Sequence, residues 1–133
     1  MLAKPSVIAP VLSQLSVPVG RSAARKRDTG MSEETWAQVK SRIIESCPVM
    51  ALRFTGDVLV PGERFERLRQ ELGERFLAVE IPSPNERWGL GKQAHSVLTE
   101  EIDVQRPDHP ATRAVASFVD FLSVRLGVEI PTD

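Results

Sequence analysis

The chain has 133 residues, of which 41% are hydrophobic and 26% are charged, and this composition excludes an intrinsically disordered protein. The length suits one globular domain. The formal net charge of −1 gives no general attraction to nucleic acid or to an anionic membrane, so neither is predicted as a partner. A single cysteine and no apolar run of membrane-spanning length indicate a cytoplasmic protein without disulfides.

The first apolar run, VIAPVLS from Val7 to Ser13, predicts an edge strand or a bulge, because Pro10 cannot donate to a sheet ladder. Residues 15–46 are interpreted as a linker and helix excursion. The excursion contains a basic cluster, which we interpret as a solvated face, with a phosphate or nucleic-acid contact as the alternative: Arg21, Arg25, Lys26 and Arg27.

A helix is predicted after Ser32, which is a favourable N-cap. Its apolar residues repeat at helical spacing and indicate one buried face, with Trp36 as a core anchor rather than a ligand-stacking residue: Trp36, Val39 and Ile43, joined by Ile44. Pro48 ends this helix.

The segment CPVMALRFTGDVLVP, residues 47–61, contains the central strand. Its apolar run from Val49 to Phe54 is interrupted only by Arg53, and this pattern is typical of a parallel strand covered on both faces. Asp57 follows the strand. In parallel α/β sheets the ligand crevice lies beyond the carboxyl ends of the strands, so Asp57 is a candidate site residue. The alternative interpretation is that Asp57 caps a turn.

The residues after Asp57 predict a helix with Phe65, Leu68 and Leu72 on one face and Gly73 at its end. The run FLAVEI, residues 76–81, predicts the next strand, so the three elements form a βαβ unit. A long loop, residues 82–106, follows and contains His95. The last helix begins at His109 and Pro110, ends at Gly127, and has its apolar side toward the sheet: Ala114, Val115, Phe118, Phe121 and Leu122. Residues 128–133 are expected to form a frayed tail.

Asp57 and His95 follow neighbouring strands of the predicted unit, so we expect both at the same carboxyl edge of the sheet. A carboxylate beside an imidazole fixes the tautomer of the ring and stabilises the imidazolium that forms when histidine accepts a proton. The order acid, then histidine, then a closing helix is that of the last two members of an α/β-hydrolase triad.

The chain resembles the C-terminal half of a dienelactone hydrolase family protein over about residues 5–127. The best-matching segments are PSVIAPVLSQ, CPVMALRFTGDVLVP, FLAVEI and AHSVLT. The resemblance implies an α/β fold, namely the C-terminal half of an α/β-hydrolase fold with about three parallel strands and flanking helices. It also implies that Asp57 is the triad acid and His95 the triad base.

The sequence departs from the family in two places. The nucleophile elbow, Gly-x-Cys-x-Gly or Gly-x-Ser-x-Gly, does not occur in these residues and is expected upstream of Met1. Ser96 and Val97 follow His95, where the family often has glycine and an aromatic residue.

Three other residues are weighed as nucleophiles. Cys47 lies at the amino end of the central strand and is interpreted as a buried structural cysteine. For the same reason a metal site formed with Asp57 and His95 is disfavoured. Ser13 and Ser16 lack the flanking glycines of an elbow.

The main hypothesis is an ester or lactone hydrolase that works through a Cys or Ser nucleophile, present here as a part that lacks the nucleophile and is predicted to be inactive alone. Its partner would be a small-molecule ester or lactone, and no cofactor or metal is predicted. The alternative is a non-catalytic remnant or interaction module. Its exposed Val7–Ser13 edge would pair with a complementary chain or a second copy.

Overall fold

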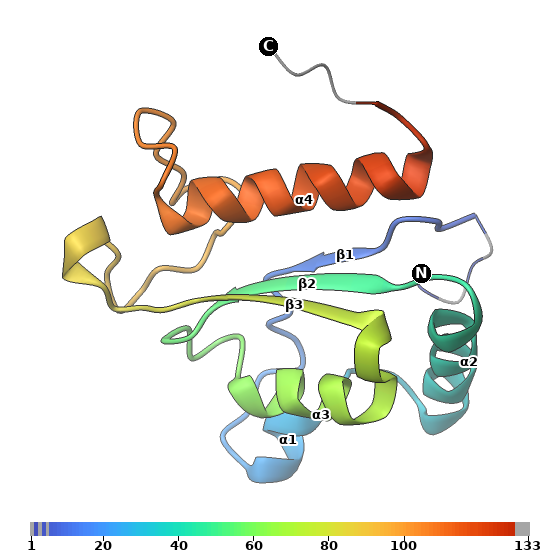
Figure 1. Cartoon of the computed structure of the whole chain (residues 1–133). Coiled ribbons are helices and arrows are strands. Elements are labelled where there is room, and N and C mark those ends of the chain that lie inside the picture. The colour runs from blue at the N-terminus through green and yellow to red at the C-terminus, as the bar shows by residue number, and fades with distance from the viewer. Residues whose placement is uncertain (1, 3, 5, 130–133) are drawn as a thin grey trace.

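Three parallel strands form the sheet in the computed structural model, which describes residues 2, 4 and 6–129 (Figure 1). The strands are β1 (Val11–Ser13), β2 (Val49–Phe54) and β3 (Phe76–Ile81), and they lie side by side in the order β1-β2-β3. In register, Leu12 is paired with Ala51, and Ala51 with Ala78. The predicted α/β architecture and the two predicted strands at residues 49–54 and 76–81 are therefore confirmed.

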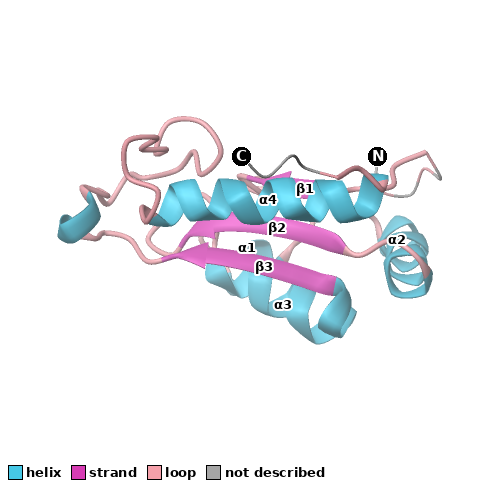
Figure 2. Ribbon diagram, turned by 45° about the horizontal axis from the view of Figure 1, so that its top comes forward, coloured by secondary structure: helices cyan, strands magenta, loops and turns pink. Residues whose placement is uncertain are grey.

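The helices form a layer on each face of the sheet. The helices α1 (Ala23–Arg27), α2 (Glu33–Glu45) and α3 (Gly62–Leu72) lie on one side, and α4 (Pro110–Leu126) covers the other, as Figures 1 and 2 show. Short 3-10 turns, η1 (Gly73–Arg75) and η2 (Glu86–Trp88), flank β3. The strand order advances in one direction, so the crossover helices lie on the same face.

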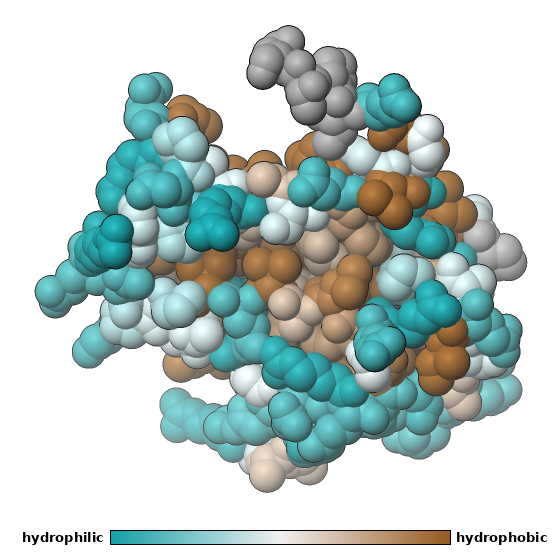
Figure 3. All heavy atoms as spheres, in the orientation of Figure 1, coloured by the Kyte–Doolittle hydropathy of each residue, from teal (hydrophilic) through white to brown (hydrophobic). Residues whose placement is uncertain are grey.

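The sheet separates two apolar clusters. The cluster toward α2 and α3 includes Trp36, Phe65 and Ala51, and the cluster toward α4 includes Phe54, Val97 and Phe121. All six residues of β2 are buried, as the nearly continuous apolar run predicts for a strand covered on both faces. At the β3 edge of the sheet, which faces the viewer in Figure 3, apolar side chains remain at the surface between the two helical layers. Leu77 of β3 is 40% exposed.

The predicted strand from Val7 to Ser13 is shorter than expected, because β1 begins only at Val11. The carbonyl of Pro10 still accepts from Met50 N at 3.1 Å, but the proline ring has no N–H to continue the ladder. The carbonyls of Val7 and Ile8 are instead bound by side chains, from Arg42 and Arg125 respectively. Pro10 therefore limits the strand to its second half.

The excursion between β1 and β2 is more ordered than the sequence suggests. Arg64 of α3 is fully buried, and its guanidinium donates to the carbonyls of Leu15, Pro18 (2.8 Å) and Arg25 (3.3 Å). Burial lowers the pKa of Arg64, and the charge of Asp28 partly offsets this effect. One buried cation thus holds the segment to the core through backbone carbonyls, a contact that local sequence pattern does not reveal.

The helix that follows matches its predicted boundaries and N-cap. Ser32 accepts from Thr35 N at 3.2 Å, and Trp36 is 2% exposed, which confirms its place in the core. Ile44, expected on the same face, is 49% exposed. It lies about 100° around the helix from the buried Ile43, beyond the stripe that contacts the sheet layer.

Glu71 joins α2 to α3. Its carboxylate accepts from Trp36 Nε1 at 2.6 Å, from Lys40 Nζ at 2.9 Å and from Arg67 Nε at 2.6 Å. Burial raises the pKa of Glu71, but the hydrogen bonds from Lys40, Arg67 and Trp36 together outweigh it and lower the pKa to about 2.

The last helix begins and ends where the sequence predicts. His109 is its N-cap, with Nδ1 accepting from Ala111 N at 3.3 Å, and Gly127 ends it with a φ of 64°. The loop before α4 is fixed by Trp88, whose ring lies beneath the guanidinium carbons of Arg87 (4.8 Å) and Arg106 (4.5 Å). Residues 130–133 of the predicted tail lie outside the described residues. Among the helices that the structure describes, none has the length and hydrophobicity to cross a membrane.

The Glu71 contacts predict a specific acid dependence of stability. Because the folded-state pKa of about 2 lies below the ordinary 4.5, the contribution of Glu71 is complete above pH 4.5 and is lost as the pH falls toward 2. Glu71→Gln should lower the free energy of unfolding by about 2 kcal/mol at pH 7, allowing for partial solvent screening. Urea unfolding at pH 7 and at pH 2.5 checks this. The free energies of unfolding of the wild type and of Glu71→Gln should be closer to each other at pH 2.5 than at pH 7. Glu74→Gln, at an exposed position of the same segment, should leave the pH dependence unchanged.

Candidate functional site

Asp57 lies in the loop after β2, and the side chain of Arg53, in β2, holds this loop through hydrogen bonds to its backbone. This side chain is 6% exposed and donates to the carbonyls of Thr55 at 3.1 Å and Val60 at 2.5 Å, one on each side of Asp57. Its Nε also lies 3.0 Å from Glu80 Oε1 on β3. The one charge inside the apolar run of β2 thus fixes the path of the loop that presents Asp57.

The loops after β2 and β3 are bonded to each other. Gly56 N donates to Ser83 Oγ at 3.1 Å, and Ser83 N donates to Thr55 Oγ1 at 3.1 Å. A Cβ at Gly56 would lie 2.5 Å from the carbonyl oxygen of Ser83, so only glycine permits this approach. The loop carrying Asp57 and the start of the loop carrying His95 therefore leave the sheet together.

Asp57 and His95 are in direct contact. Asp57 Oδ2 lies 2.5 Å from His95 Nδ1, across 38 residues of sequence. The other carboxylate oxygen, Oδ1, accepts from Leu59 N at 2.9 Å. The expectation that the two side chains meet at one carboxyl edge of the sheet is confirmed, and the turn-capping alternative is also present, since each oxygen of the carboxylate has one of the two roles.

His95 is placed by its neighbours in the chain. Ala94 and Val97 are buried in the cluster beneath α4, at 3% and 0% exposure, whereas the side chain of His95 is 30% exposed. Within the described part of the chain, His95 Nε2 makes no hydrogen bond, while Nδ1 contacts Asp57. An imidazole held at Nδ1 by a carboxylate, with no hydrogen bond at Nε2 among the described residues, is arranged to accept a proton at Nε2 from a group next to it.

The other candidate residues do not join this pair. Cys47 is 3% exposed at the amino end of β2, with Sγ 3.4 Å from the carbonyl oxygen of Val7, so it is buried at the end opposite to Asp57. Ser13 is the last residue of β1 and Ser16 lies just beyond it, but no hydrogen bond links either to His95 in the described residues. Within the same residues, no group of three or more His, Cys, Asp and Glu side chains could hold a metal ion.

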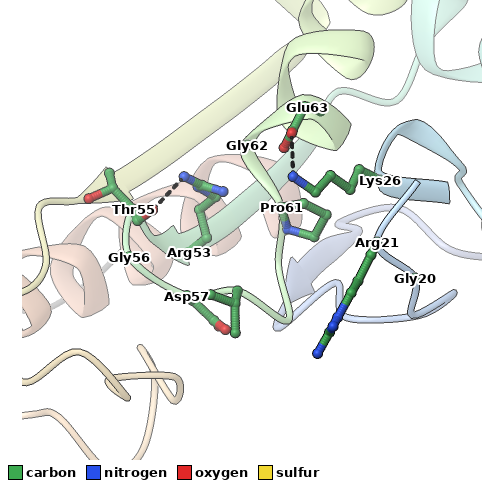
Figure 4. Close-up of a pocket in the computed structure, with 11 residues that line it drawn as sticks. Gly20, Arg21, Lys26, Arg53, Thr55, Gly56, Asp57, Pro61, Gly62 and Glu63 are labelled. Atoms are coloured by element: carbon green, nitrogen blue, oxygen red, sulfur yellow. Dashed lines mark hydrogen bonds and ion pairs between the residues drawn. The ribbon is translucent and has the colours of Figure 1, made fainter. Parts of the chain in front are cut away.

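A pocket of about 490 Å³ opens beside Asp57, between the loop after β2, the start of α3 and the segment around α1 (Figure 4). Its rim includes Arg21 and an ion pair between Lys26 and Glu63 at 2.9 Å. The hydrogen bond from Lys26 lowers the pKa of Glu63. In the basic cluster of the excursion, Arg21 and Arg25 are exposed, whereas Lys26 and Arg27 are half-buried. Most of the cluster is paired with polar groups on α3 or within its own segment.

Two features of the site were not found from the sequence. Arg53 carried a detectable signal, because a charge within a buried strand requires a partner, and Glu80 stands opposite it in the register of β2 and β3. The second feature is a hydrogen bond from Gln14 Nε2 to Ser96 Oγ at 2.6 Å, which joins β1 to the His95 loop. No spacing or periodicity indicates that contact, since 82 residues separate the partners.

Comparison of the chain with known proteins finds no match. No family model matches the chain, and the searches of curated proteins and of solved structures return no match.

The geometry predicts that Asp57 selects the tautomer of His95. In Asp57→Asn, the amide oxygen should continue to accept from Leu59 N, which turns the amide NH₂ toward His95 Nδ1. The neutral ring should then change from the Nδ1–H to the Nε2–H form. ¹⁵N NMR of the imidazole distinguishes the two forms, and His109, which is buried and bonded at both nitrogens, serves as the internal reference. Retention of the Nδ1–H form in the variant would contradict the assigned roles of the two oxygens.

Proposed function

We propose that the chain is the acid-and-base part of a dienelactone hydrolase-like enzyme of the α/β-hydrolase fold, which hydrolyses a small ester or lactone. The observation that carries the proposal is the 2.5 Å contact between Asp57 Oδ2 and His95 Nδ1 at the carboxyl edge of a parallel sheet. The resemblance of the segments around both residues supports the same family. The single buried Cys47 supports a cytoplasmic location.

The reaction uses each nitrogen of His95 for one purpose. A Ser or Cys nucleophile attacks the carbonyl carbon of the ester while His95 Nε2 takes its proton, and Asp57 stabilises the resulting imidazolium through Nδ1. The imidazolium then gives this proton to the leaving alcohol oxygen, and the acyl group remains on the nucleophile. Water attacks the acyl group in the second half, with Nε2 as base, and releases the acid and the free nucleophile.

The nucleophile of this reaction is proposed to come from a segment outside these 133 residues. The sequence contains neither form of the elbow motif, and in the described residues Nε2 of His95 has no hydrogen-bond partner. By the family resemblance, that segment would lie beside β1. The chain by itself then supplies a positioned base with no group to deprotonate.

We expect the purified chain to hydrolyse activated esters no faster than buffer, and a covalent probe for active-site Ser or Cys to leave it unlabelled. In cells that express the native gene, the probe should label a nucleophile-bearing segment, either fused to this chain or co-purifying with it. Asp57→Asn and His95→Ala should each reduce the labelling rate by about 10² or more. The rate is measured by gel fluorescence over time.

Cys47→Ser is the matched control, because Cys47 is buried at the opposite end of β2, and it should leave labelling unchanged. Burst release of a leaving group by the purified chain, abolished by replacing one of its own Ser or Cys residues, would contradict the absent nucleophile. Labelling that does not depend on Asp57 and His95 would contradict the hydrolase itself.

A second candidate function is a non-catalytic interaction module that pairs through the β1 edge. The specific observation is an apolar groove of about 350 Å³ beside β1 and α4. The residues that line it all have apolar side chains: Leu2, Val7, Ala9, Pro10, Val11, Leu12, Phe118 and Leu122. β1 has only β2 as a neighbour among the described strands, so its outer edge presents unpaired backbone groups.

This edge predicts that the isolated chain associates. Sedimentation velocity should show a concentration-dependent shift away from monomer, because the groove and the strand edge both favour contact with another chain. Val7→Lys in the groove should weaken the association by about tenfold or more, since a buried lysine requires a partner. Val104→Lys, at a 76% exposed position outside the groove, is the control and should have no effect. A single monomer boundary at all concentrations, with cooperative thermal unfolding, would argue against this surface.

A further inference from the structure

Gln14 has an unusual backbone conformation at the edge of the site. It follows β1 directly, at the same end of the sheet at which Asp57 follows β2. Its φ is 59°, in the left-handed region, and no other non-glycine residue of the described chain has a positive φ. A glutamine in this region carries a conformational cost that glycine would avoid, and such residues persist where the surrounding structure holds them.

The surrounding contacts hold Gln14 toward the loop of His95. The carbonyl of Gln14 accepts from Ser16 N at 2.7 Å, which closes a tight turn, and its side chain donates from Nε2 to Ser96 Oγ at 2.6 Å. Leu15 is in turn fixed by the buried Arg64. The left-handed residue is therefore anchored on its C-terminal side, and its side chain reaches across the sheet edge.

Ser96 is the fixed point of the His95 loop. It is 7% exposed, and its carbonyl lies within hydrogen-bonding distance of the backbone N–H groups of Thr99, Glu100 and Glu101 (3.4, 3.2 and 3.3 Å). His95 is the adjacent residue. A tether on Ser96 Oγ thus acts on the backbone from which the imidazole projects.

We propose that Gln14 is a positioning residue for His95: through Ser96 it sets the distance between the imidazole and the β1 edge, while Asp57 sets the rotation of the ring. The inference rests on the proposed function, in which the nucleophile approaches beside β1. Asp57 fixes one ring nitrogen from the loop after β2, and Gln14 fixes the adjacent residue from the end of the neighbouring strand β1, so the two contacts constrain the imidazole from different directions.

The test measures exchange of the His95 Nδ1 proton with water by NMR, on the chain alone. Gln14→Leu and Ser96→Ala should each accelerate exchange by about tenfold, the effect of losing one hydrogen bond, and the double variant should be no faster than either single variant. Gln14→Glu keeps the length and accepts from the Ser96 hydroxyl, so it should restore slow exchange. Gln93→Leu makes the same chemical change at an exposed position of the same loop and should have no effect.

Gln14→Gly separates positioning from stability. It removes the conformational cost of the left-handed residue, so the midpoint of thermal unfolding should not fall, yet exchange should be as fast as in Gln14→Leu. Unchanged exchange in Gln14→Leu, equal acceleration by Gln93→Leu, or failure of Gln14→Glu to restore slow exchange would each overturn the proposal.

The outcome is distinguishable from that of the hydrolase proposal. Probe labelling of a nucleophile that depends on Asp57 but not on Gln14 would sustain the hydrolase and overturn this inference. Accelerated exchange in Gln14→Leu without any labelling that depends on Asp57 would keep the tether and remove the hydrolase.

Discussion

A buried guanidinium in the central strand is the interaction on which the candidate site depends. Arg53 extends from β2 and bonds the carbonyls of Thr55 and Val60, while its Nε lies 3.0 Å from Glu80 on β3. Because the five donors of a guanidinium lie in one plane, a single side chain can fix both ends of a loop and bind a neighbouring strand. Asp57 lies between the two bonded carbonyls, so its position follows from a buried cation rather than from the loop sequence alone.

The carboxylate of Asp57 combines a structural role with a chemical one. Oδ1 closes the turn on Leu59, and Oδ2 faces His95. The turn bond orients the carboxyl plane, so Oδ2 is directed toward His95. This arrangement explains why interpreting Asp57 as a turn residue and interpreting it as a site residue do not exclude each other. A carboxylate has enough lone pairs for both contacts. The side chain of Asp57 is only 5% exposed, so both contacts are made in a buried position.

The two edge strands of the sheet, β1 and β3, differ in the contacts of the segments next to them. Before β1 the backbone carbonyls of Val7 and Ile8 accept hydrogen bonds from arginine side chains, and an apolar groove lies beside the strand. At the other edge β3 leads into the loop of Trp88 and His109, whose rings meet edge to face at 5.6 Å. The loop is therefore packed where it returns to α4. Around His95 it is held by the contacts of His95 with Asp57 and of Ser96 with Gln14. Both proposed functions involve the β1 edge, where the apolar groove lies.

The sequence by itself determined the strands at residues 49–54 and 76–81, the helices after Ser32 and His109, and the meeting of Asp57 with His95. These follow from periodicity, capping residues and the rule that parallel strands end at one edge, all of which are local or topological. Only the tertiary structure decided which side chains bind the carbonyls before β1, how the loop of Asp57 is held, the exposure of Ile44, the anchoring of residues 15–25 and the contact of Gln14 with Ser96. Each of these depends on which distant group supplies a hydrogen bond or covers a surface. The donors are long side chains, chiefly Arg42, Arg53 and Arg64, and a guanidinium can reach carbonyls anywhere within its radius, so local sequence does not reveal its acceptors.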